Sequence, residues 1–417
     1  MLVQTILNRI QKQPGFVYGR VRLVETPWQV TVEIELRPRA RRRPTCSGCQ
    51  RPGPGYDTLP ARRVEFVPLW GMAVFFVYAM RRVACPACGV RVETVPWALG
   101  KHHLTTTYAW FLATWAKRMS WTAVAGAFHT TWEHVFHSVE MAVTWGRAHV
   151  DREGITAAGI DELQWQHGHG YLTLVYQLDE HRKRLLWIGA ERKVQTLLGF
   201  FRWLGPARSA RLRFICSDMW QPYLRVVAQK AGQACHILDR FHVMAHFSKA
   251  IDHIRAQEAR ALKAKGAHPV LMRTRWVLLK RPANLTEPEV GRLAELLRYN
   301  LKAVRAYLLK EEFQFFWTYL ASYAAGRFLD RWTTRALRSR LAPMQKVARM
   351  LRAHRPLLLN WFRAKGRISA GAVEGFNNKA KLTTRTAYGF RTYRGIELAL
   401  YHALGDLPEP QVAHRFC

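Results

Sequence analysis

The chain has 417 residues, with 64 Lys and Arg against 29 Asp and Glu, so its formal net charge is +35 at pH 7. A hydrophobic share of 49% can bury a sizeable core, which excludes a disordered or low-complexity chain. At roughly 100–200 residues per domain, the length predicts two to four domains. A positive surplus of this size repels itself in a compact fold, so a polyanionic partner is expected. Nucleic acid, an anionic membrane surface and an acidic protein all fit the charge alone.

The amino-terminal segment lacks the basic region and long apolar stretch of a secretory signal. The longest apolar run, residues 66–80, contains Pro and Gly and is shorter than the roughly 20 residues of a spanning helix. Its aromatic and β-branched content favours one or two buried strands. Seven cysteines, four of them in two tight pairs, are typical of a reducing compartment. We therefore expect a soluble, cytoplasmic protein.

The first hundred residues predict β structure. Residues 29–36 alternate apolar and polar side chains, which is the period of a strand with one buried face. A basic, turn-rich stretch follows, in which Arg41, Arg42 and Arg43 are candidate DNA contacts.

Two CxxC pairs, Cys46 with Cys49 and Cys85 with Cys88, enclose residues 50–84. Two such knuckles supply the four thiolates of a closed tetrahedral zinc site. The enclosed segment is long enough to form the hairpin of a zinc ribbon, so we predict a structural Zn²⁺ that folds this module. The alternative is two unrelated thiol pairs or a redox pair.

Residues 105–150 change to helical spacing and predict a helix-turn-helix. Ser120 and either Thr130 or Thr131 are candidate N-caps, and Ala125 permits the close crossing of two helices. The second helix is a candidate for the major groove of DNA. The alternative is an ordinary helix pair that binds nothing.

The following segment predicts a mixed α/β sheet, because three adjacent strand patterns are followed by alternating helix and strand. The expected strands are 155–163, 171–178, 185–188, 212–216 and 234–238, and the expected helices are 194–204 and 222–231. From 246 to about 361 the chain is helical and basic, with a capping box from Thr286 to Glu289. Further helices are expected over 369–385 and 392–404.

Three acids lie where phosphodiester chemistry could use them. Asp161 is near the end of one expected strand, Asp218 follows another, and Glu374 lies on a helix. Two-metal chemistry needs carboxylates that converge from separate chain segments, and ligands of α/β sheets bind at the carboxyl ends of strands. Taken singly, each acid is better explained as a solvated or capping residue. The three together, in their strand, strand and helix contexts, favour the metal-binding role.

The ordered set of motifs resembles the DDE transposases of bacterial insertion sequences, in particular the ISL-three family. The marks are the CSGC…CPAC pairs, the helix pair, Gly159-Ile160-Asp161-Glu162, Ser217-Asp218-Met219-Trp220, Asp239-Arg240-Phe241-His242, Asn284-Leu285-Thr286 and Glu374-Gly375-Phe376-Asn377-Asn378-Lys379. The resemblance covers nearly the whole chain. It implies an RNase H-like catalytic domain with an acidic triad of Asp161, Asp218 and Glu374, which would bind two Mg²⁺ or Mn²⁺ ions.

The resemblance also implies that the helical stretch is an insertion between the second and third acids, and that Asp239 and His242 form a DxxH signature. The expected fold class is multidomain α+β. The expected parts are a zinc-ribbon β domain (1–100), a helix-turn-helix (101–150), a first catalytic part (151–245), an α-helical insertion (246–365), and a last catalytic part with the tail (366–417).

Several of these site assignments have alternative residues or roles. Asp161 and Glu162 are adjacent, and because successive strand side chains alternate faces, only one is expected to face the metals. The resemblance selects Asp161. Glu397 is the fallback for the third acid. His242 and His246 have metal-ligand spacing, but positioning of the site is the preferred role for His242.

Further candidate DNA contacts are Lys379, Lys381 and Arg385 on the Glu374 helix, and Trp220 near Asp218. The resemblance implies a nucleoid-associated protein without a membrane partner. Its expected partners are the inverted repeats of the element and target DNA, bound by a dimer or a higher oligomer. The expected function is end cleavage and strand transfer. The alternatives are a non-catalytic zinc-ribbon DNA-binding regulator and an RNase H-like nuclease that cleaves without joining.

Overall fold

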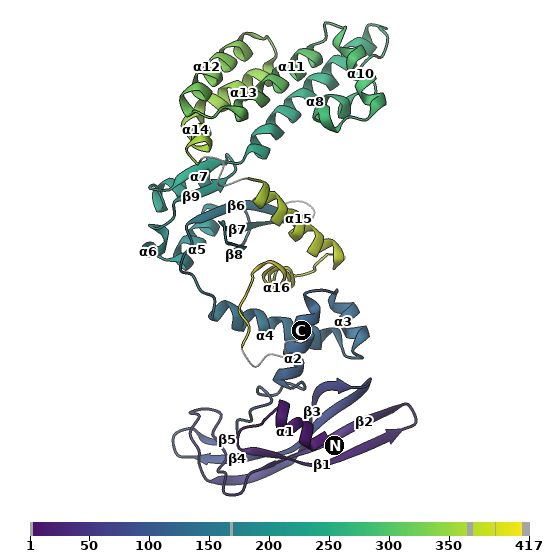
Figure 1. The fold of residues 1–417 in the computed structure, drawn as a ribbon, viewed down its shortest axis with the longest axis vertical. Coiled ribbons are helices and arrows are strands. Elements are labelled where there is room, and N and C mark those ends of the chain that lie inside the picture. The colour runs from purple at the N-terminus through teal and green to yellow at the C-terminus, as the bar shows by residue number, and fades with distance from the viewer. Residues whose placement is uncertain (1–2, 167–169, 365–369, 388, 411–417) are drawn as a thin grey trace. The chain divides into compact units, whose positions relative to one another are not determined.

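The computed structural model describes residues 3–166, 170–364, 370–387 and 389–410. It divides into two compact units (Figure 1). The first comprises Met1–Asp151 with Thr383–Cys417, and the second comprises Arg152–Leu382.

The first unit begins with a helix and a five-stranded sheet. Its elements are α1 (Val3–Ile10), β1 (Phe16–Thr26), β2 (Gln29–Pro38), β3 (Gly55–Leu69), β4 (Met72–Cys85) and β5 (Gly89–Val92). The order is β1-β2-β4-β3, with β5 also paired to β4, and only the β2–β4 pair is parallel. The alternation predicted over residues 29–36 is confirmed, because Val32, Ile34 and Leu36 of β2 are buried on one face.

The apolar run at residues 66–80 forms the end of β3 and most of β4. The two strands are joined at Trp70 and Gly71, whose φ angles of 49° and 81° are the left-handed values of a tight hairpin turn. The prediction of buried strands here is confirmed.

Helices α2 (Thr106–Ala116), α3 (Trp121–Ala127), α4 (Trp132–Ala148) and α16 (Tyr393–Leu404) complete the first unit. The side chains of Ser120 and Thr131 cap α3 and α4 by accepting backbone N–H bonds, as predicted. The segment from Thr383 belongs to this unit, whereas the sequence grouped all of 366–417 with the catalytic part. The physical reason is that α16 packs on α4 and its Arg394 pairs with Glu140.

The second unit contains the mixed sheet predicted from the strand patterns. Its strands are β6 (Ala157–Gln164), β7 (Tyr171–Asp179), β8 (Arg182–Ala190), β9 (Phe214–Ser217) and β10 (Cys235–Leu238), and the order is β10-β9-β6-β7-β8. Strands β6, β9 and β10 are parallel, while β7 is antiparallel to both neighbours. Helices α5 (Val194–Leu204), α6 (Pro206–Ser209) and α7 (Gln221–Lys230) lie between the strands in the chain.

The all-helical segment forms directly after β10. Its elements are α8 (Arg240–Ala264), α9 (Arg275–Leu279), η1 (Pro282–Asn284), α10 (Glu287–Leu297), α11 (Lys302–Gln314), η2 (Phe315–Thr318), α12 (Ser322–Arg338), α13 (Ala342–Ala353) and α14 (Arg355–Arg363). It has its own aromatic core, which includes Phe247, Phe313 and Trp332. The predicted capping box of Thr286 and Glu289 is present.

Helix α15 (Ala370–Thr386) returns the chain to the sheet of the second unit (Figure 1). Among the helices of the described residues, none is long and apolar enough to cross a membrane.

Candidate functional site

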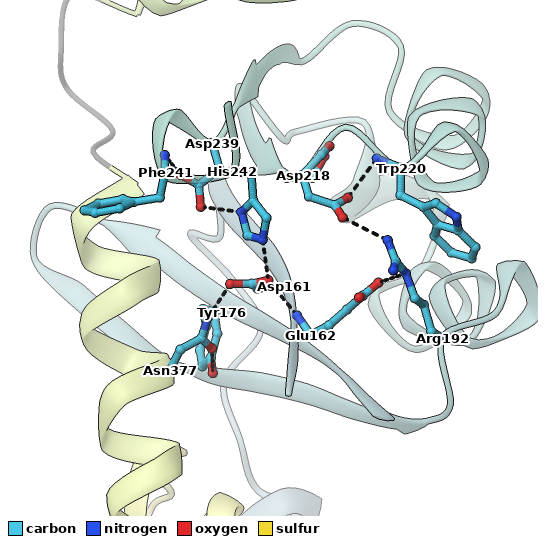
Figure 2. Close-up of polar contacts among 11 residues, drawn as sticks. Asp161, Glu162, Tyr176, Arg192, Asp218, Trp220, Asp239, Phe241, His242 and Asn377 are labelled. Carbon is cyan, nitrogen blue, oxygen red and sulfur yellow. Dashed lines mark hydrogen bonds and ion pairs between the residues drawn. The ribbon is translucent and has the colours of Figure 1, made fainter. Parts of the chain in front are cut away.

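Three parallel strands bring an acid each toward one end of the sheet. Asp161 lies in the second half of β6, Asp218 directly follows β9, and Asp239 directly follows β10. The carboxyl ends of parallel strands are where α/β sheets bind ligands. Figure 2 shows Asp161 and Asp239 on either side of His242, with the neighbouring Asp218 turned toward Trp220 and Arg192.

Asp161 is held by groups from three elements. Its Oδ1 accepts the backbone N–H of Glu162 at 2.7 Å, and its Oδ2 accepts the side-chain amide of Asn377. The Tyr176 hydroxyl on β7 donates to Asn377 Oδ1 at 2.8 Å. Burial raises the pKa of Asp161, and the nearby His242 opposes that rise. The carboxylate is therefore fixed in direction and costly to keep ionised without a cation.

His242 connects Asp161 with Asp239. Asp239 caps α8 by accepting the Phe241 N–H at 2.7 Å, and its Oδ2 accepts His242 Nδ1–H at 3.1 Å. The other ring nitrogen, Nε2, lies 3.8 Å from Asp161 Oδ1. The hydrogen bond to Asp239 raises the pKa of His242 to about 9, so the imidazole is cationic at neutral pH.

Asp218 has different partners. Its Oδ1 accepts the Trp220 N–H at 3.0 Å, and its Oδ2 lies 3.1 Å from Arg192 Nη2. Arg192 also pairs with Glu162 and lies over the Trp220 ring, with its Cζ 4.5 Å from the ring centroid. Burial raises the pKa of Glu162 to about 7. Asp161 and Glu162 thus turn to different partners, as Figure 2 shows.

Glu374 lies on α15, which is docked on the sheet beside Asp161. Phe376 stacks on Tyr176 with ring centroids 4.9 Å apart. An ideal Cβ on Gly159 of β6 would lie 2.7 Å from Val373 Cγ2, so only glycine permits this approach. Glu374 itself is half-buried, adjacent to the residue that contacts β6.

The described acids and histidines form one group of at least three with ligand atoms within 4.8 Å of one another, and it consists of Asp161, Asp239 and His242. Neither Asp218 nor Glu374 belongs to this group. The structure therefore brings Asp161 closest to the DxxH pair, while Asp218 contacts Arg192.

The four cysteines of the two CxxC pairs come together in the first unit. Their sulfurs lie within 4.8 Å of one another, with Cys49 Sγ and Cys85 Sγ 3.5 Å apart. A tetrahedral site with Zn–S bonds of about 2.3 Å places sulfurs about 3.8 Å apart, so this cluster fits zinc. The Gly48 N–H donates to Cys46 Sγ at 3.4 Å, which is the backbone support that thiolates need. The Ala87 N–H lowers the pKa of Cys85 to about 7.

The candidate DNA contacts differ in their surroundings. Arg41 and Arg43 are exposed, but Arg42 lies with its Cζ 3.8 Å from the centroid of the Phe16 ring. Burial there lowers the pKa of Arg42. Arg42 therefore packs on the core of its sheet.

On α15, Lys381 and Arg385 are exposed, and Lys379 Nζ is 5.9 Å from the Phe376 ring. Trp220 is half-buried beneath Arg192 and meets Tyr223 edge to face, with centroids 4.5 Å apart. This packing leaves Trp220 less available for stacking on a base.

Two parts of the site were missed from the sequence. The bridge formed by Arg192 carries no local signal, because the residue lies in the loop after β8. Asn377 could have been found, since it is three residues from Glu374 and so close to the same helix face. The fallback acid Glu397 pairs with Arg147 and Arg394 inside the first unit.

Comparisons with known proteins agree with the motifs. A family model described as a transposase, of the ISL-three DDE type, matches residues 158–399. The chain is 31% identical over 404 residues to the transposase for insertion sequence element IS1557 of Mycobacterium tuberculosis, covering 90% of this chain and 89% of that protein. It is 28% identical over 397 residues to the transposase for insertion sequence element IS1001 of Bordetella parapertussis, and the match covers 94% of this chain and 96% of that protein.

The protein is thus a transposase by class, and the chain belongs to the ISL-three family of DDE transposases. The resemblance predicted from the sequence motifs is confirmed.

Proposed function

We propose that this transposase binds the terminal inverted repeats of an insertion sequence, cleaves the ends and joins them to target DNA. The observation that carries the proposal is the convergence of acids at the ends of the parallel strands, with the Glu374 helix docked beside them. The mixed sheet, with an antiparallel hairpin on one side and parallel strands on the other, supports an RNase H-like catalytic core.

Asp161, Asp218 and Glu374 are proposed to hold two Mg²⁺ or Mn²⁺ ions. Asp161 fits this role because burial raises its pKa, and a bound cation would relieve that cost. Bound metal supplies activation of water, a template for in-line displacement and stabilisation of the leaving oxygen.

The protein's own groups orient the reaction. Asn377 and Tyr176 fix the direction of the Asp161 carboxylate, and the cationic His242 balances its charge from the opposite side. After hydrolysis frees a 3′-hydroxyl at the element end, that hydroxyl attacks a target phosphodiester. No Ser or Tyr nucleophile is required, because no covalent protein–DNA intermediate forms.

The remaining parts are proposed to hold DNA. The cysteine cluster would bind structural zinc in a zinc ribbon, which with the helix-turn-helix of α3 and α4 would recognise the inverted repeats. The helical insertion, residues 240–364, has 25 Lys and Arg against 8 Asp and Glu, and so suits flanking or target DNA. Synapsis of two ends requires at least a dimer, acting in the cytoplasm on the nucleoid.

The test is incubation of the protein with end-bearing DNA and Mg²⁺. Strand-transfer products support the proposal, nicking alone favours the nuclease, and a mobility shift without cleavage favours the regulator. Glu374→Gln should abolish cleavage while DNA binding persists. The matched variant Glu397→Gln alters an acid that pairs with Arg147 and Arg394, and should retain cleavage. Equal loss in both variants would contradict the assignment of Glu374.

A further inference from the structure

A groove runs along the helical insertion between α8 and α13. It has a volume of about 510 Å³, and its walls include His246, Lys249 and His253 from α8 and Lys346 from α13. All four side chains are exposed. Their spacing on α8, with steps of three and four residues, places the first three on one face of the helix.

The groove carries uncompensated positive charge. Neither Lys249 nor Lys346 pairs with a carboxylate within the described residues. Six of the eight acids of the insertion pair with cations outside the groove: Asp252 with Arg255 and Arg275, Glu289 with Lys280, Glu295 with Arg292, Glu311 with Lys310, Glu312 with Arg335, and Asp330 with Arg355. A seventh, Glu258, accepts the backbone N–H groups of Lys302 and Ala303. A groove lined by unpaired cations attracts a polyanion. Its cations come from both walls, Lys249 from α8 and Lys346 from α13.

The groove begins one helical turn from the candidate catalytic site. His242, which lies 3.8 Å from Asp161, is one turn before His246 on the same helix. The charge of Asp218 also acts on His246, where it opposes the lowering of the pKa by burial and by Lys249. The same face of α8 therefore leads from the acids into the groove.

We propose that this groove binds the sugar–phosphate backbone of the DNA strand that leads away from the scissile phosphate. This rests on the proposed function of the acids. The helix rises about 1.5 Å per residue, so His246, Lys249 and His253 lie about 6, 10 and 16 Å along it from His242. At about 3.4 Å per base pair, the contacted phosphates are about two to five base pairs from the cleavage point.

The experiment measures DNA binding by Lys249→Ala/Lys346→Ala in an Asp161→Asn background, which removes cleavage. Substrates carry single neutral methylphosphonates at successive positions on either side of the cleavage point. The matched control is Lys263→Ala/Lys265→Ala, which removes two exposed lysines from the far end of the same helix. Melting temperatures check that all variants are folded.

The groove variant should lose roughly fivefold in affinity per contact at 0.15 M salt, and the magnitude of its salt slope should fall by about 1.8. Methylphosphonates about two to five base pairs from the cleavage point should weaken the parent but not the groove variant. Two results would overturn the proposal: the same loss in the control pair, or undiminished sensitivity of the groove variant at those positions. If the protein with Asp161 intact neither cuts nor joins DNA, while the Asp161→Asn proteins show this lysine-dependent pattern, the proposed function is refuted and the groove assignment stands.

Discussion

The guanidinium of Arg192 lies 3.1 Å from the carboxylate of Asp218, one of the acids proposed to bind metal. The same guanidinium pairs with Glu162 and covers the Trp220 ring. Arg192 therefore supplies the positive charge that a divalent cation would bring to Asp218. Metal and arginine compete for one carboxylate, so the ion pair lowers the apparent metal affinity of the site.

Arg192→Ala should bind Mn²⁺ more tightly than the unchanged protein. A partly exposed ion pair contributes about 0.5–1 kcal/mol, which corresponds to a two- to fivefold change in affinity. Calorimetric titration with Mn²⁺ measures this directly. Arg208→Ala, which removes a partner of Glu153, is the control and should leave the affinity unchanged. Weaker binding by Arg192→Ala would mean that the arginine orients the carboxylates rather than competing for them.

Gly159→Ala should disturb the docking of α15. The new methyl group would lie 2.7 Å from Val373 Cγ2 and 2.8 Å from Leu178 Cδ1, so the cost is that of overpacking, about 1–3 kcal/mol. DNA cleavage should fall with stability, because the Glu374 helix moves away from β6. Urea unfolding and a cleavage assay measure the two effects.

Val373→Ala in the Gly159→Ala background removes one of the two clashes and should restore part of both properties. A double variant as impaired as the sum of the single variants would show that the two side chains do not meet.

Zinc removal should unfold the cysteine module. The purified protein should contain one zinc ion per chain, and Cys88→Ser should contain little or none, because a structural site needs all its ligands. Loss of the metal should weaken binding to inverted-repeat DNA, measured by fluorescence anisotropy. Cys235→Ala changes a cysteine on β10, outside the cluster, and should keep both zinc and binding. Zinc retained in full by Cys88→Ser would exclude the four-cysteine site.

Acid should destabilise the protein partly through His402. Burial lowers the pKa of this α16 residue to about 3, below the ordinary value of 6.5. The neutral ring is favoured in the folded state, so its stabilising contribution is complete above pH 6.5 and declines as pH falls from 6.5 toward 3. Between these values the unfolded chain binds the extra proton.

Thermal melts at pH 5 and 7.5 measure the effect. His402→Leu should show a smaller acid-induced fall in melting temperature than the unchanged protein, whereas the exposed His181→Leu should not. Part of the fall should persist, because burial also lowers the pKa of His236, to about 4. An identical fall in His402→Leu would assign the acid sensitivity to other groups.

Local patterns predicted the elements of the fold well. The expected helix at 194–204 coincides with α5, and the five strands of the second unit occur where period and composition placed them. The helix N-caps could also be predicted from the sequence, because the hydrogen bonds of Ser120 and Thr131 involve only neighbouring residues. These features are determined by residues close together in the chain, so they can be predicted from a single sequence.

Features that depend on contacts between distant parts of the chain were harder to predict from the sequence. The sequence pattern predicted that the helical segment begins at residue 246. In the structure α8 begins at Arg240, because Asp239 caps the helix and also binds His242. The attachment of α16 to α4 depends on tertiary packing that no period reveals. Arg192 could be identified as a partner of Asp218 only from the structure, which places β8 and β9 in one sheet.

The bond between Asn377 and Asp161 joins residues that are 216 positions apart. During synthesis, β6 must therefore wait for the helical insertion and then for α15 before its carboxylate acquires this partner. At about 5–20 residues per second, the wait is about 10–45 s. A nascent chain that already displays its cysteine module and the first part of its sheet still lacks an assembled acidic site. Chains released from ribosomes that stop within the insertion would lack both α15 and α16, so neither the acidic site nor the first unit would be complete.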